Sequence, residues 1–290
     1  MWLLVDSTAM SGHVYAVAGG KGGVGKTTSA INLGAALRAA GHDTVVVDAD
    51  LAMANLGAMV DILSGPTLHD VLAGEAALHE ALVWLPEDGP PTRSPPDEGP
   101  HLVAVPGSRS LDAFAAADPD GLGGVLRSLA DAADFVLCDT GAGLSHDNTV
   151  PLGVADGVVV VTTPDPVAVA DARKTIDFAA RAGGTIVGAA VTHAGEETDV
   201  SALADELGIE MLAVVPETDV AGDEPLVEVA PESYAADAYE RLAATLADRG
   251  DPSTGEFADS DLVSRSTEPE TDDATVVERL SGVFDRSEND

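Results

Sequence analysis

Lysine is almost missing from this chain of 290 residues. It occurs three times, at Lys21, Lys26 and Lys174, beside 11 arginines and 50 acidic residues, and the formal net charge is -36. A surface poor in lysine and rich in Asp and Glu keeps a protein hydrated where concentrated salt screens its self-repulsion. We therefore expect adaptation to a saline cytosol. We do not expect DNA as a partner, because few cations are left to neutralise phosphates.

Cysteine is also scarce, and long apolar runs are absent. The single cysteine, Cys138, cannot form an internal disulfide, and no metal-spaced cysteine pair exists, so we expect a small core residue of a cytoplasmic protein. No apolar run reaches the 18 residues of a membrane-spanning helix, and the first residues lack the basic flank of a signal peptide. Aromatic residues make up 3% and hydrophobic residues 45%, which predicts a core of Ala, Val and Leu.

A glycine-rich stretch near the N-terminus fits the phosphate-loop pattern G-x-x-x-x-G-K-[ST]. A buried strand over 14–18 precedes it, and a helix over 26–40, ended by Gly41, follows it. In such a loop, backbone N–H groups face phosphate oxygens, Lys26 reaches the β- and γ-phosphates, and the Thr27 hydroxyl ligates Mg²⁺. The expected nucleotide contacts are Gly20, Lys21, Gly22, Gly23, Val24, Gly25, Lys26, Thr27 and Thr28.

Apolar strands and amphipathic helices alternate along the chain. We predict further strands over 44–47, 102–105, 135–138, 157–161, 185–191 and 211–215, and helices near 68–72, 122–132, 167–182, 201–207 and 234–247. Residues 51–85 are otherwise helical or irregular, and 86–100 form a surface loop. This order predicts an α/β fold with a mostly parallel, doubly wound sheet, helices on both faces and the ligand at one sheet edge. We expect a flexible N-terminus (1–13), an ATPase domain (14–250) and a disordered acidic tail (251–290).

Several segments together resemble the MinD/ParA ATPases. Residues 21–28 resemble their deviant Walker A motif, 45–57 their switch I, and 137–143 their Walker B and switch II, while 103–108 and 214–217 also look like MinD segments. The resemblance covers roughly residues 14–248 and is strongest to MinD-like proteins of halophilic archaea. It implies a P-loop NTPase fold, ATP and Mg²⁺ as cofactors, and slow, partner-regulated ATP hydrolysis.

Three aspartates and a proline are candidate site residues. Asp139 ends an apolar strand at the expected ligand edge, where a carboxylate can bind the Mg²⁺ shell through water. The resemblance implies that Asp50 positions or activates the attacking water, that Asp48 supports the metal, and that Pro216 lies at the nucleotide. The alternative is that these aspartates only cap turns.

Lys21 is the residue that an ordinary phosphate loop does not need. The resemblance implies that it reaches across a homodimer, formed on ATP binding, to the partner's nucleotide, so that Lys21, Lys26 and Asp50 are the catalytic candidates. The family often has an Asn-Arg pair near the adenine, where this chain has Thr192-His193. His193 either contacts the base or has no such role. Ser145-His146-Asp147 is consecutive, which does not indicate a catalytic triad, and we assign it to switch II.

The acidic tail contains a short amphipathic stretch over 275–286. Its apolar residues are Val276, Val277, Leu280, Val283 and Phe284. Bacterial MinD proteins end in a membrane-targeting helix, which would place the protein peripherally at the membrane. Such helices are normally basic, however, and this one is not. We therefore favour docking to a protein partner or to the domain itself.

The expected function is an ATP-dependent, dimerising switch that positions a cellular structure such as a division site, a surface appendage or a receptor array. Two alternatives stay open. One is a metabolic ligase or synthase that uses ATP on the same scaffold, and the other is a nucleotide-binding adaptor that does not hydrolyse ATP. The true start, Met1 or Met10, also stays open.

Overall fold

The computed structural model describes residues 12–62, 64–96, 99–143, 148–218 and 225–250. Within these ranges the strands are β1 (His13–Ala18), β2 (Thr44–Ala49), β3 (Val83–Trp84), β4 (Leu102–Val105), β5 (Phe135–Thr140), β6 (Gly157–Thr162), β7 (Ile186–Ala194) and β8 (Met211–Pro216). The α-helices are α1 (Lys26–Ala39), α2 (Leu56–Met59), α3 (Leu68–Leu72), α4 (Leu78–Ala81), α5 (Leu111–Ala116), α6 (Leu122–Ala130), α7 (Thr149–Val154), α8 (Pro166–Arg181), α9 (Val200–Leu207), α10 (Leu226–Val229) and α11 (Tyr234–Gly250).

The strands form one sheet in the order β3-β4-β2-β5-β1-β6-β7-β8. Every pairing is parallel except that of β3 with β4, which is antiparallel. Strands β2 to β5 therefore lie on one side of β1, with β5 inserted between β1 and β2, and β6 to β8 lie on the other side. The carboxyl end of β1 is a point where the strand order reverses, which is where open α/β sheets bind ligands.

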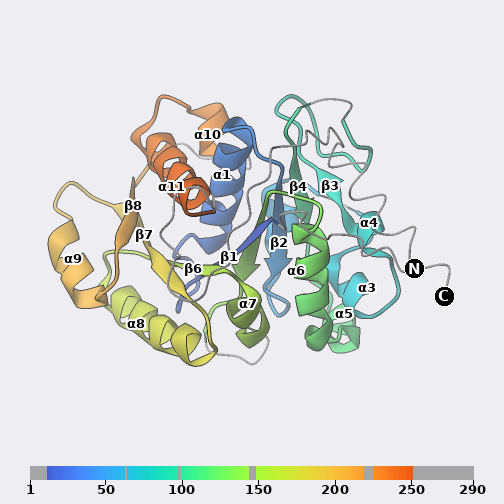
Figure 1. Ribbon diagram of the computed structural model, residues 1–290, viewed down its shortest axis with the longest axis horizontal. Coiled ribbons are helices and arrows are strands. Elements are labelled where there is room, and N and C mark those ends of the chain that lie inside the picture. Colours follow the sequence, from blue (N-terminus) through green and yellow to red (C-terminus); the bar gives the residue numbers. More distant parts are fainter. Residues whose placement is uncertain (1–11, 63, 97–98, 144–147, 219–224, 251–290) are drawn as a thin grey trace, which may run out of the picture.

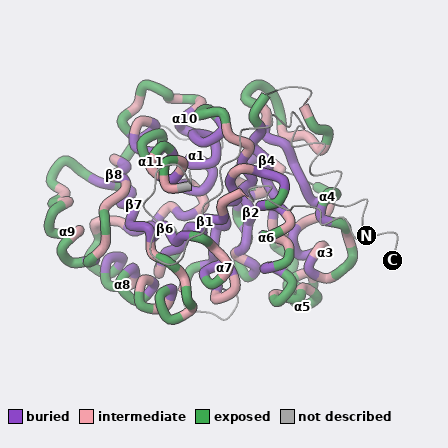
Figure 2. The backbone as a smooth tube through the Cα atoms, in the orientation of Figure 1, coloured by how far each residue is buried: buried purple, intermediate pink, exposed green. Residues whose placement is uncertain are grey.

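Side chains alternate between the two faces of the sheet and bury both of them. Val46 on β2 belongs to the apolar cluster under α1, α10 and α11, while its neighbours Val45 and Val47 pack under α3, α4 and α6. A third cluster lies under α8 and α9. Figure 1 shows α1 and α11 together on one side of the sheet and α6, α7 and α8 on the other, and Figure 2 shows buried strands between helices with exposed outer faces.

The expected fold class is confirmed, with local differences. β5 includes Asp139 and Thr140, β7 runs on to Ala194, and β1 begins at His13. The short elements β3, α2, α4, α5 and α10 were not predicted, because two to six residues are too few to show a period. Cys138 is fully buried, as expected.

Helix α1 is buried on nearly all sides, whereas an amphipathic helix buries one face. The reason is tertiary: α11 covers the side that faces away from the sheet, and the Ser29 hydroxyl lies 3.2 Å from the Tyr239 hydroxyl. The N-terminal residues 1–11, the segment 145–147 and the tail over 251–290 lie outside the described residues. In the part of the chain that is described, no helix is both long and apolar enough to cross a membrane.

Candidate nucleotide and magnesium site

The glycine-rich loop connects β1 to α1 at the expected edge of the sheet. Gly23 has φ +78° and Gly25 has φ +85°, which is the left-handed region that glycine adopts without a steric cost. No atom lies within 4 Å of the place where a Cβ on Gly23 would stand. The loop therefore presents open backbone in front of the N-terminus of α1, the arrangement that binds phosphate.

Thr192 on β7 holds this loop in place. Its hydroxyl lies 2.7 Å from the carbonyl oxygen of Val24 and 3.1 Å from that of Thr162. A hydroxyl carries one proton, so the two carbonyls share it. The sequence had placed Thr192 only as a departure from the adenine-side Asn-Arg pair. Its role in the loop becomes visible only when β7 and the loop are brought together.

Lys26 and Thr27 lie where the motif places them. Lys26 is 8% exposed, and its ammonium lies 3.5 Å from the carbonyl oxygen of Lys21 across the loop. The Thr27 hydroxyl donates a hydrogen bond of 2.6 Å to Oδ2 of Asp139. Because Asp139 lies on β5, this bond joins the start of α1 to the strand beside β1.

The parallel register of β2 and β5 places Asp48 directly beside Asp139. Both carboxylates are buried, at 0% and 1% exposure. Oδ2 of Asp48 accepts hydrogen bonds from the backbone N–H groups of Asn55 at 3.0 Å and Leu56 at 2.9 Å. Switch I is thereby tied to the carboxylate at the end of its own strand.

Burial makes both carboxyl groups hard to ionise in the absence of a cation. Burial, followed by the negative charge of Asp48, raises the pKa of Asp139 from 3.8 to about 8, although the Thr27 hydrogen bond and the charge of Lys26 oppose the rise. Burial likewise raises the pKa of Asp48 to about 6. A divalent cation would favour the charged form of both groups.

The oxygen atoms at this edge fit Mg²⁺. Within the described ranges, Oδ1 of Asp48 and Oδ1 of Asp139 are buried without a hydrogen-bond partner. Mg²⁺ prefers oxygen ligands and is usually bound by one or two carboxylates together with water and nucleotide phosphates. No cluster of three or more His, Cys, Asp or Glu suited to a metal occurs among the residues that the structure places. Thr27, Asp139 and Asp48 would thus hold the ion with help from the nucleotide, and the ion would neutralise phosphate charge.

Asp50 lies within switch I, near switch II. Its Oδ1 accepts a hydrogen bond of 3.0 Å from the backbone N–H of Met53. A Cβ added to Gly141 would stand 3.0 Å from that same oxygen and 2.9 Å from Oδ1 of Asn148. Gly141 is the residue that allows this close approach. The geometry thus brings Asp50 beside the segment after β5, and its role toward water stays a prediction.

His69 is a residue of this site that sequence reasoning missed. It is fully buried at the start of α3. Its Nδ1 accepts a hydrogen bond of 2.9 Å from the backbone N–H of Ser108, so the neutral ring carries its proton on Nε2, which lies 2.9 Å from the carbonyl oxygen of Leu51. His69 therefore connects switch I to the loop after β4. No sequence motif predicts that a buried histidine will connect these two segments.

Lys21 is separated from this interior. Its side chain is 44% exposed, and its ammonium lies 3.3 Å from Oδ1 of Asp165. Asp165 also caps the N-terminus of α8 by accepting from the N–H groups of Val167 and Ala168. The hydrogen bond from the Ala168 N–H, and after it the one from Lys21, lowers the pKa of Asp165. Both partners are exposed, so the contact is easily exchanged.

Two other predicted residues lie farther along the same edge. Pro216 ends β8, beyond β7, and is paired in register with Ala194. His193 is exposed with φ +51°, and its Nδ1 lies 3.2 Å from the Thr192 hydroxyl. The contacts of Pro216 and His193 with a nucleotide stay predictions.

A phosphate loop at the switch point of a mostly parallel sheet, with two adjoining strand-end carboxylates, defines a P-loop nucleoside triphosphatase. The chain belongs to the CobQ/CobB/MinD/ParA nucleotide-binding domain family, which matches residues 15–226. The protein is accordingly an ATPase that uses Mg²⁺.

Relatives match most of the chain. It is 36% identical over 240 residues to an uncharacterised ATP-binding protein of Methanocaldococcus jannaschii, covering 80% of this chain and 86% of that protein. Among solved structures, the cell division ATPase MinD of Pyrococcus furiosus is 31% identical with a TM-score of 0.73, covering 82% of this chain and 99% of that one. The septum site-determining protein MinD of Pyrococcus horikoshii, complexed with Mg-ADP, is 31% identical with a TM-score of 0.72, covering 85% of this chain and 98% of that one.

Proposed function

We propose that this protein is an ATP-dependent switch that dimerises on binding ATP, separates after slow hydrolysis and uses this cycle to position a cellular structure. The names of two similar proteins, a cell division ATPase and a septum site-determining protein, support the positioning role. A division site, a surface appendage and a receptor array are the candidate structures. In this cycle Lys26 contacts the phosphates, Asp50 orients the attacking water and Lys21 acts across the dimer.

The position of Lys21 is the observation that supports the proposed dimer. Lys26 points into the buried part of the loop, whereas Lys21 is on its surface and contacts an exposed carboxylate. A cation there is free to exchange that carboxylate for phosphate oxygens of a nucleotide bound to a second copy, where negative charge develops during hydrolysis. The chain has three lysines in all, and two of them are in this loop.

The substitution Lys21→Ala tests this role, and the chain offers a matched control. Lys174 is also a surface lysine beside an aspartate, with its ammonium 2.8 Å from Oδ1 of Asp171, but it lies on α8 outside the loop. We expect Lys21→Ala to abolish dimerisation on ATP, measured by sedimentation in MgATP, and Lys174→Ala to leave it unchanged. A Lys21→Ala protein that still dimerises and turns over ATP normally would refute the proposal.

The substitution Asp50→Ala separates ATP hydrolysis from ATP-dependent dimerisation. If Asp50 orients water, this variant should bind ATP and stay dimeric because it cannot hydrolyse the nucleotide. Imaging it beside the wild type in cells should show a location that no longer cycles. Loss of ATP binding in this variant would assign Asp50 to the nucleotide contact instead.

The partner and the place of action rest on the tail, which lies outside the described residues. We infer from its sequence that 275–286 docks to a protein partner or to the ATPase domain, with a membrane surface as the alternative. Deleting residues 251–290 and following the location of the protein tests whether the tail has either role, and an unchanged location would contradict both. A metabolic ligase is favoured by no specific feature of the site.

A further inference from the structure

Two side-chain oxygens from distant segments meet beside Gly141, which follows β5. The place where a Cβ on Gly141 would stand lies 2.9 Å from Oδ1 of Asn148 and 3.0 Å from Oδ1 of Asp50. Asp50 directly follows β2, and Asn148 directly precedes α7. Because glycine has no side chain, both oxygens border a space at the ligand edge of the sheet that residue 141 leaves unfilled.

The orientation of the Asn148 amide is fixed by its nitrogen. Nδ2 donates a hydrogen bond of 3.0 Å to the carbonyl oxygen of Gly143. Only the nitrogen of an amide donates, so Oδ1 is the atom that lies toward Gly141 and Asp50. The residue is 4% exposed, and within the described ranges no group donates to its Oδ1. A buried acceptor of this kind needs a donor.

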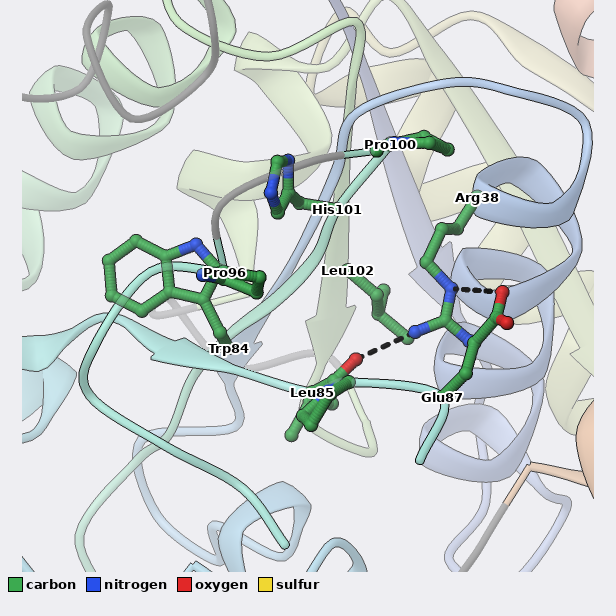
Figure 3. Close-up of a pocket in the computed structure, with 10 residues that line it drawn as sticks. Arg38, Trp84, Leu85, Glu87, Pro96, Pro100, His101 and Leu102 are labelled. Atoms are coloured by element: carbon green, nitrogen blue, oxygen red, sulfur yellow. Dashed lines mark hydrogen bonds and ion pairs between the residues drawn. The ribbon is translucent and has the colours of Figure 1, made fainter. Parts of the chain in front are cut away.

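Access to solvent distinguishes this oxygen from other polar atoms that lack a hydrogen-bond partner among the described residues. Nε of Arg38, Nε1 of Trp84 and Nε2 of His101 are closed off from solvent. They belong to the lining of a cavity of about 320 Å³ at the far end of α1, where Arg38 is already paired with Glu87 (Figure 3). Oδ1 of Asn148, by contrast, keeps surface that water reaches.

The oxygens of Asn148 and Asp50 together fit one water molecule. An amide oxygen and an ionised carboxylate only accept hydrogen bonds, so they repel each other unless a donor lies between them. Asp50 has capacity left, since its Oδ1 accepts from the N–H of Met53 at 3.0 Å and a carboxylate has about four acceptor positions. A water molecule has two protons and reaches acceptors at about 2.8 Å. It therefore donates to both side chains and keeps its lone pairs free.

We propose that Asn148 is a catalytic residue that holds the attacking water together with Asp50. This inference rests on the proposed role of Asp50 in ATP hydrolysis. The oxygen of the held water forms a bond to the γ-phosphorus while the bond to the bridging oxygen breaks, and the products are ADP, inorganic phosphate and one proton released to solvent. Two acceptors fix the direction of the water, which one acceptor alone does not.

The substitution Asn148→Ala, made in the full chain, removes the second acceptor. We expect hydrolysis of bound ATP in a single turnover to slow at least about tenfold, because a hydrogen bond to the attacking water is lost. The affinity for MgATP, measured by calorimetry, and dimerisation on ATP, measured by sedimentation, should stay within about twofold of the wild type. A change in binding without a change in the hydrolysis step would contradict the proposal.

A double-mutant cycle with Asp50→Ala tests whether the two residues hold the same water. If they do, adding Asn148→Ala to Asp50→Ala costs little, and the double variant hydrolyses ATP within about twofold of Asp50→Ala alone. If Asn148 acts elsewhere in the fold, the two losses multiply. Multiplied losses would overturn the proposal.

Gly141→Ala fills the space from the other side. Its Cβ would stand about 3 Å from both oxygens, so we expect it to exclude the water and to slow single-turnover hydrolysis at least about tenfold. Gly124→Ala on α6 is the matched control, because no atom lies within 4 Å of the added Cβ, and it should hydrolyse ATP as the wild type does. Normal hydrolysis by Gly141→Ala would show that no catalytic water uses this space, and it decides the matter even if Asn148→Ala does not fold.

The results also separate this inference from the proposed function. Normal hydrolysis by Asp50→Ala would contradict the role of Asp50 and, with it, the shared water. Slow hydrolysis by Asp50→Ala beside normal hydrolysis by Asn148→Ala would overturn the role of Asn148 alone.

Discussion

The buried pair of Asp48 and Asp139 should destabilise the nucleotide-free protein, and Asp139→Asn should relieve this cost. Asparagine keeps an oxygen that accepts from Thr27 and carries no charge. The folded protein holds a proton on Asp139 up to a pKa of about 8, whereas the ordinary value is 3.8. Because the folded pKa is raised, the stability linked to this group is fully present below about pH 3.8. It is lost as the pH rises toward 8.

The size of the effect follows from these two values. Between pH 5 and pH 8, keeping Asp139 protonated in the folded wild type, while the unfolded chain would ionise it, costs about 4 kcal/mol at 1.36 kcal/mol per pKa unit. This is an upper bound, because water and local movement relieve part of the cost of a buried ion. We expect the stability of Asp139→Asn relative to the wild type to grow by about 2–4 kcal/mol over this range. For a domain of this size, that corresponds to a melting temperature higher by about 4–16 °C.

The assay is unfolding by heat and by urea at pH 5 and pH 8, without nucleotide or Mg²⁺. Asp205→Asn on α9 is the matched control, because it removes the same charge from an exposed position of a chain with a net charge of -36. Its stability should follow that of the wild type at both pH values. The reasoning fails if the stability of Asp139→Asn relative to the wild type does not increase between pH 5 and pH 8. Burial would then not disfavour the ionised carboxylate.

Three further substitutions address the site. Thr27→Val removes the hydroxyl that donates to Asp139 and should weaken Mg²⁺-dependent ATP binding at least about tenfold by calorimetry, while Thr27→Ser retains it; equal affinities would contradict the role. His69→Leu should lower kcat with little change in KM, because it releases switch I from the loop after β4. His69→Gln, which can both donate and accept, should restore turnover, and a loss that Gln does not rescue would mean a packing role alone. Gly107→Ala should cost about 1–3 kcal/mol in urea unfolding, since the added Cβ would stand 2.6 Å from Cβ of Ala54 and 3.2 Å from Cγ of Asp48; unchanged stability would show that the loop can move away.

Most of the sheet could be predicted because its strands are apolar runs that need no partner to be recognised. Val45 to Val47 and Val158 to Val161 are examples. The strand β3 could not be predicted, because two residues show no pattern and Val83 and Trp84 become a strand only by pairing with β4. The sequence also did not indicate that the side of α1 facing away from the sheet is buried. Tyr239, whose side chain covers it, is more than 200 residues away in the chain.

The candidate site divides in the same way. The phosphate loop is local: Gly23, Gly25, Lys26 and Thr27 act through their own backbone and immediate spacing, so the sequence by itself determined them. Tertiary structure decided the rest. The register of β2 and β5 places Asp48 beside Asp139. Packing at the far end of the sheet buries Nε1 of Trp84 and Nε2 of His101 without a hydrogen-bond partner among the described residues. Contacts between distant segments depend on how the sheet and its covering helices pack together, and this packing cannot be deduced from the spacing of residues along the chain.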